Sequence, residues 1–106
     1  VELTPTEMAV ACIPVVTTLN LKRLAKACGA KKAALARPSK IPTVTGYILG
    51  AVSPIGQKLP LRTIVDASAA LHSTIFVSGG RRGLEIEITY DALLGLSAGR
   101  LAKISV

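Results

Sequence analysis

The chain has 106 residues and a formal net charge of +7, from 13 Lys and Arg residues against 6 Asp and Glu residues. Hydrophobic residues make up 50% of it, which excludes an intrinsically disordered chain and suffices for one domain with a single modest core. The sequence has no run of about 18 uninterrupted apolar residues, which argues against a transmembrane helix. No basic-then-apolar leader follows Val1, so a signal peptide is not visible.

Strands and helices are predicted to alternate along the first third of the chain. Residues 8–15 form a continuous apolar run, which indicates a buried strand. Asn20 is a favourable N-cap for a helix over residues 21–28, and Gly29 is a favourable residue to end it. A short strand is predicted over residues 32–36.

The remainder of the chain continues the alternation. Residues 38–44 are ambiguous because Pro38 and Pro42 interrupt them. Further predicted elements are strands over 61–65, 74–78 and 84–89, with a tight turn over 79–83, a helix over 90–96 and a last strand over 101–106. This pattern predicts a single domain of the α/β or α+β class, with helices flanking a mixed sheet.

Positive charge is concentrated in one long stretch. Between Met8 and Val65 there are nine basic residues and no acidic one. These bases are Lys22, Arg23, Lys26, Lys31, Lys32, Arg37, Lys40, Lys58 and Arg62. Such a stretch attracts polyanions and favours nucleic acid as the partner, whereas a merely soluble basic surface is the alternative. With 2 Tyr, 1 Phe and no Trp, the contacts should involve phosphates more than stacked bases.

The nucleophilic and metal-binding residue types are sparse. Cys12 and Cys28 belong to no CxxC pair and are interpreted as small reduced core residues, which fits a cytoplasmic location. His72 is the only histidine, and neither a GxSxG elbow nor a P-loop is present. We therefore expect no metal or other cofactor, and no Ser-His or Cys-His catalytic pair within this chain.

Two glycine-rich segments are candidates for a binding site. In residues 45–56, the backbone amides of Gly50 to Ser53 could converge on an oxygen atom, as an oxyanion hole requires, although a plain turn is the simpler reading. In residues 78–83, a glycine pair precedes Arg81 and Arg82, which suggests a phosphate contact, whereas an ordinary hairpin is the alternative.

Four segments in register carry a family resemblance. They cover residues 19–32, 46–56, 64–67 and 77–86, and include Gly46-Tyr47-x-x-Gly50-x-x-Ser53-Pro54-x-Gly56 and Ser78-Gly79-Gly80-Arg81-Arg82-Gly83. The chain resembles the aminoacyl-tRNA deacylases related to the editing domain of bacterial prolyl-tRNA synthetase. Within this family, the chain most resembles the branch of free-standing Cys-tRNA(Pro) deacylases, the YbaK/EbsC group.

The resemblance implies a fold and an activity. The fold is expected to be a mixed α/β domain with a curved, partly barrel-like sheet. The activity is hydrolysis of the ester that joins a wrong amino acid to tRNA, here Cys-tRNA(Pro), with the substrate thiol as attacking group. Expected partners are mischarged tRNA and prolyl-tRNA synthetase, with no membrane. An Ala-tRNA(Pro) deacylase that uses water and a catalytically silent tRNA- or synthetase-binding module stay open as alternatives.

The resemblance also implies roles for particular residues. The expected catalytic residues are Gly50, Ala51, Ser53 and Pro54 of a GxxxP loop. The expected substrate-binding residues are Tyr47, Ser78, Gly79, Gly80 and Glu85, and the expected tRNA contacts are Arg81, Arg82 and Lys58. Glu85 stands where the nearest relatives usually have Asp. The family carries a Lys-Thr motif upstream of the position of Val1, so residues 1–106 are expected to be an editing-like domain without its N-terminal part.

Overall fold

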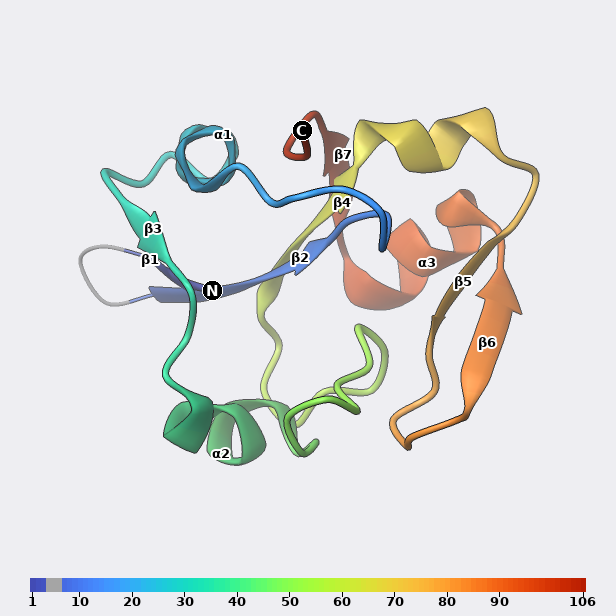
Figure 1. Cartoon of the computed structure of the whole chain (residues 1–106), viewed down its shortest axis with the longest axis horizontal. Helices are drawn as coiled ribbons and strands as arrows, with labels where there is room; N and C mark the ends of the chain where they lie inside the picture. The colour runs from blue at the N-terminus through green and yellow to red at the C-terminus, as the bar shows by residue number, and fades with distance from the viewer. Residues whose placement is uncertain (4–6) are drawn as a thin grey trace.

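The computed structural model describes residues 1–3 and 7–106 (Figure 1). In chain order its elements are β1 (Glu2–Leu3), β2 (Glu7–Cys12), α1 (Leu21–Ala27), β3 (Ala33–Ala34), α2 (Ile41–Thr45), β4 (Arg62–Asp66), β5 (Ile75–Ser78), β6 (Glu85–Ile88), α3 (Tyr90–Ser97) and β7 (Arg100–Ala102). Short 3₁₀ helices, Pro38–Lys40 and Ala67–Leu71, precede α2 and follow β4. None of the described helices has the length and hydropathy needed to cross a bilayer.

Five strands form one mixed sheet in the order β3-β1-β2-β4-β7. The β1 strand pairs antiparallel with β2 and β3, whereas β2, β4 and β7 run parallel, with Ala11 opposite Ile64 and Val65 opposite Leu101. The α+β class and the mixed sheet are confirmed. The barrel-like form is corrected: within the described residues β5 and β6 pair only with each other, so β3 and β7 remain open edges.

Helix α1 confirms the predicted capping residues. The Asn20 side chain accepts a hydrogen bond from the Arg23 amide at 3.0 Å, which satisfies one free N–H of the first turn. At the other end Gly29 has φ +67°, the left-handed conformation that ends helices at low cost. Leu24 is fully buried, so the helix covers the sheet with its apolar face.

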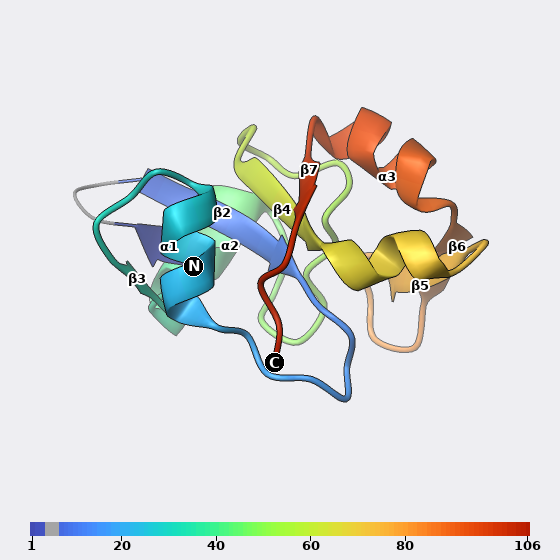
Figure 2. The same cartoon turned by 90° about the horizontal axis from the view of Figure 1, so that it is seen from above.

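Strand β4 separates two halves of the core. Successive strand residues face opposite sides of a sheet, so Ile64 packs with Leu24 and Ile104 beneath α1, whereas Val65 packs with Leu93 of α3. Figure 2 shows α1 and α3 on opposite sides of this central strand. Four consecutive residues of β4 are buried, as expected for a parallel strand covered on both faces.

A buried carboxylate fixes the C-terminal segment to the end of β4. One oxygen of Asp66 accepts hydrogen bonds from the amides of Ile104 and Ser105, each at 3.0 Å. The other oxygen accepts from the amide and hydroxyl of Ser68. Burial alone would raise the pKa of Asp66, but these hydrogen bonds to the charged form lower it to about 2.

Several predicted boundaries need correction. The strand expected over 32–36 is limited to β3, and the last strand stops at Ala102, shortly before the amides of Ile104 and Ser105 donate to Asp66. Beyond that point the chain bonds to residues near the start of α1, with reciprocal backbone hydrogen bonds between Thr18 and Val106. The ambiguous segment 38–44 lies in the first 3₁₀ helix and α2, whose prolines occupy first-turn positions that need no N–H.

Candidate active site

The first glycine-rich segment is a compact loop closed by a short neck. The Lys58 amide donates to the Thr45 carbonyl at 2.8 Å, and the Leu59 amide donates to the Val44 carbonyl at 3.2 Å. Between these bonds the chain folds back on itself, and Ala51 and Ser53 are only 1% and 2% exposed. This is the geometry of an Ω-loop, which holds its own backbone in a defined shape.

Tyr47 holds this loop against the β5–β6 hairpin. Its amide donates to the hydroxyl of Thr45 at 3.0 Å, and its own hydroxyl donates to the Ile55 carbonyl at 2.5 Å. A Cβ added to Gly80 would lie 2.6 Å from the Tyr47 ring, so only glycine allows this approach. Two segments about thirty residues apart in sequence therefore meet through one aromatic ring.

The loop contains several backbone amides without partners. Gly50 has φ +89°, and the Ala51 amide donates to the Ile48 carbonyl at 3.0 Å, which closes a turn. Within residues 1–3 and 7–106, the amides of Gly50, Val52 and Ser53 find no intramolecular acceptor. Free amides in one tight loop can donate to an oxygen that gains negative charge during a reaction.

The side chains of the loop serve its shape. The hydroxyl of Ser53 accepts from the Ile55 amide at 3.2 Å, and its carbonyl accepts from the Gln57 side chain at 2.9 Å. Pro54 lines a hollow with Leu61 and Leu96, away from the hairpin. The expectation of catalytic roles for Ser53 and Pro54 stays a prediction, and their contacts are those of residues that frame the loop.

The hairpin brings the second set of predicted residues together. Ser78 stands directly opposite Glu85 across β5 and β6, so the two side chains share one face. The Gly79 amide donates to the Leu84 carbonyl at 2.8 Å, and the Gly80 amide donates to the Ser78 hydroxyl at 3.2 Å. These bonds close the predicted tight turn.

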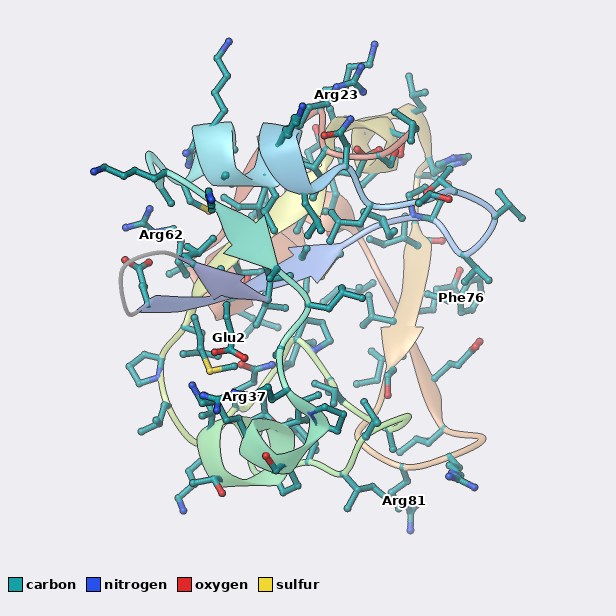
Figure 3. All side chains as sticks on the ribbon, turned by 60° about the vertical axis from the view of Figure 1, so that its left-hand side comes forward. Glu2, Arg23, Arg37, Arg62, Phe76 and Arg81 are labelled. Atoms are coloured by element: carbon teal, nitrogen blue, oxygen red, sulfur yellow. The ribbon has the colours of Figure 1, made fainter. Side chains whose placement is uncertain are left out.

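Basic side chains flank the junction of loop and hairpin. A guanidinium nitrogen of Arg82 lies 4.0 Å from the position that a Gly50 Cβ would take, so it stands over the loop. Lys58 is exposed at the neck of the loop, and Arg81 is exposed at the turn of the hairpin (Figure 3). Cations beside free amides suit an anionic group next to an ester.

The cysteines and the histidine lie outside this junction. Cys12 and His72 line a separate cavity of about 410 Å³ between the end of β2 and β5, and its lining contains none of the predicted site residues. Burial raises the pKa of the Cys12 thiol to about 11, so it is protonated at neutral pH. Cys28 directly follows α1 and is buried in the core that the helix covers. No group of three metal-binding side chains occurs among the described residues.

One contributor to the junction was not predicted: Thr45 orients Tyr47 through its buried hydroxyl. The Val52 amide belongs to the predicted set from Gly50 to Ser53, and it is one of those without an acceptor. Thr45 directly precedes Gly46, a helix-ending glycine with φ +81°, and that adjacency was the available signal.

Comparison with known families now defines the class. The profile of the aminoacyl-tRNA editing domain family matches residues 4–96, and the chain belongs to this family. A protein of Enterococcus faecalis named as a proposed Cys-tRNA(Pro)/Cys-tRNA(Cys) deacylase, EbsC, is 43% identical over 96 residues. The match covers 91% of this chain but only 58% of EbsC, so the chain spans less than two thirds of that relative. The predicted resemblance is confirmed.

Solved structures confirm the fold. The crystal structure of a hypothetical protein matches with a TM-score of 0.88 at 22% identity, over 99% of this chain and 69% of that one. The crystal structure of a proposed trans-editing enzyme for prolyl-tRNA synthetase matches with a TM-score of 0.86 at 20% identity, over 99% and 66% of the two chains. At these identities the likeness concerns the fold alone.

Proposed function

We propose that this chain hydrolyses the ester of mischarged aminoacyl-tRNA in trans, and that its substrate is Cys-tRNA(Pro). The observation that carries the proposal is the junction of loop and hairpin, where Tyr47 packs on Gly80 beside three amides without acceptors. Membership of the editing-domain family and 43% identity to EbsC support the same activity. Residues 1–106 would act as one editing domain, in the cytoplasm.

The proposed reaction takes its nucleophile from the substrate. The cysteinyl sulfur attacks the ester carbonyl carbon, a C–S bond forms, and the C–O bond to the terminal ribose breaks. The thiol proton ends on the ribose oxygen, and water then opens the resulting thiolactone to free cysteine. The amides of Gly50, Val52 and Ser53 would donate to the carbonyl oxygen while it carries negative charge. Arg81, Arg82 and Lys58 would contact tRNA phosphates.

The Cys12 thiol and the Ser53 hydroxyl are poorly placed to act as nucleophiles, which supports a nucleophile that comes from the substrate. The Cys12 thiol is protonated at neutral pH, and the Ser53 hydroxyl is buried and bonded within its loop. Neither group can attack an ester without an adjacent base that would remove its proton. We further propose that prolyl-tRNA synthetase is the source of the mischarged tRNA and a partner of this chain, since a synthetase cannot exclude a similar-sized side chain by binding alone.

A single-turnover assay with three substrates tests the proposal. The chain is incubated with Cys-tRNA(Pro), Ala-tRNA(Pro) and Ser-tRNA(Pro), with the Enterococcus faecalis EbsC protein run in parallel. We expect hydrolysis of the cysteinyl ester and strongly slower hydrolysis of the seryl ester, because a hydroxyl is far less ionised than a thiol. Preferred hydrolysis of Ala-tRNA(Pro) would indicate the water-using alternative. Binding without hydrolysis of any ester would indicate a silent module.

A further inference from the structure

A lysine-lined groove runs along α1, far from the proposed ester site. Four lysines surround it, two from the helix and two from the segment that follows: Lys22, Lys26, Lys31 and Lys32. Its volume is about 620 Å³, and its apolar lining consists of Leu21 and three alanines. All four lysines are exposed. The groove therefore offers a row of mobile positive charges above a shallow surface of small side chains.

The charges in this groove are not neutralised by neighbouring carboxylates. Among residues 1–3 and 7–106, the ion pairs join Arg37 and Lys40 to Glu2, and Arg62 to Glu7. None of them includes a groove lysine. Three other bases of the acid-free stretch are thus compensated by the acids at its edge, whereas the four groove lysines lie together without such a partner. Such a surface attracts anions over distances of about 10 Å at moderate salt.

Helix stability explains only Lys26, whose charge in the last turn of α1 favours the helix dipole. Lys22 lies in the first turn of α1, where positive charge opposes the helix dipole, and no acidic residue stands there to offset it. Lys22 and Lys26 are four residues apart on one face, a spacing at which like charges repel. The unfavourable charge of Lys22 is the expected result when that charge serves a ligand instead of the helix.

The groove and the proposed ester site occupy opposite ends of the molecule. Figure 3 places Arg23, on α1, at the top and Arg81, in the hairpin turn, at the bottom, and Figures 1 and 2 show the same separation of α1 from β5 and β6. The longest extent of the fold is 35 Å. A ligand that reaches both places must be long, anionic and continuous.

We propose that this groove binds the phosphodiester backbone of tRNA, at phosphates distant from the aminoacyl end. The inference rests on the proposed function, which places the aminoacyl ester at the loop and hairpin. A membrane surface fits the groove poorly, because it lacks the large apolar or aromatic side chains that anchor a helix in lipid. The strong point charge and flexible stem of each lysine suit phosphates whose exact positions vary along an RNA backbone.

Two charge-matched variants test the groove. The groove variant is Lys26→Gln with Lys31→Gln, and the control is Arg100→Gln with Lys103→Gln. The control removes the same charge from exposed positions that lie outside the groove lining and, among the described residues, in no ion pair. Binding of tRNA(Pro) that carries no amino acid is measured by filter retention between 50 and roughly 200 mM salt. We expect a log–log salt slope of roughly −2 to −5 for the wild-type chain.

The outcomes distinguish tRNA binding at the groove from attraction by the overall positive charge of the chain. We expect the groove variant to flatten the slope by about 1.5, because each lost phosphate contact removes about 0.7–0.9, and the control to change it by less than about 0.5. Equal changes in both variants, or no change in either, would overturn the proposal. Lys22→Gln should also weaken binding while its Tm stays level or rises, since it relieves an unfavourable charge. Wild-type binding without ester hydrolysis would contradict the proposed function and leave the groove intact.

Discussion

Replacement of Gly50 by alanine isolates the contribution of the loop backbone to catalysis. Gly50 has φ +89°, and a Cβ added there meets nothing nearer than the Arg82 guanidinium at 4.0 Å. The substitution therefore introduces backbone strain without a steric clash. Gly29 at the end of α1 is a matched position, with φ +67° and open space around its Cβ. The two variants carry the same kind of strain, but only one lies in the proposed site.

The expected magnitudes follow from this match. A non-glycine residue in the left-handed region costs about 1–2 kcal/mol, so both variants should lose stability by that amount. In Gly50→Ala the loop can relieve the strain only by turning its peptide groups, which moves the amides proposed to stabilise the oxyanion. Loss of one such donor lowers kcat by about 10²–10³-fold. Gly29→Ala should keep kcat within about twofold of the wild type.

The assay is single-turnover hydrolysis of Cys-tRNA(Pro) at saturating protein, with unfolding followed by circular dichroism on the same samples. At saturating protein the rate does not depend on tRNA affinity, so any effect of Gly29→Ala on binding at the neighbouring groove does not enter kcat. A folded Gly50→Ala protein with unimpaired kcat would refute the oxyanion role of the loop. An equal loss in Gly29→Ala would show that strain alone, at any position, impairs the enzyme.

Three other perturbations test separate parts of the structure. Asp66→Asn should destabilise the fold by about 1–3 kcal/mol at neutral pH, because buried amides lose a charged acceptor. Since the pKa of Asp66 is lowered in the folded state, its stabilisation is present above pH 4 and is lost as pH falls toward 2, so urea titrations of wild type and variant should converge there. Cys12→Ala combined with Cys28→Ala should leave deacylation nearly intact, and a loss at unchanged Tm would implicate a protein thiol. Gly80→Ala should place a methyl group against the Tyr47 ring. We expect kcat in the same hydrolysis assay to fall strongly while thermal melting shows that the protein stays folded.

Local signals in the sequence account for most of the fold. Asn20 and Gly29 placed α1 to within one residue, because capping depends on side chains and φ values close in sequence. The pairing of strands was not predictable in the same way. Whether β7 joins β4 or β5 depends on burial and on the distant acceptor Asp66, and neither leaves a local pattern.

The candidate site was predictable as a set of segments but not as a geometry. The glycines of both segments indicated that another group approaches the backbone closely. In the structure that group is the Tyr47 ring, which packs directly against Gly80. Sequence alone could not show that the Ala51 amide is used to close a turn, because the choice between a turn and a free donor depends on φ and ψ. The lysine groove was visible only as part of an acid-free stretch, since its separation from the paired bases is a property of the folded surface.

The position of Ile104 to Val106 has a consequence for synthesis of the protein. Ile104 is fully buried against the strand and helix formed by the first quarter of the chain, and Val106 exchanges backbone hydrogen bonds with Thr18. Residues 104–106 must therefore meet residues of the first quarter of the sequence before the core beneath α1 is complete. A nascent chain cannot close this core until residues 104–106 have emerged from the ribosome, so its apolar segments remain exposed until then. Chaperone contact during that interval is the expected consequence, and a ribosome-stalled chain that stops before residue 104 should be sensitive to protease.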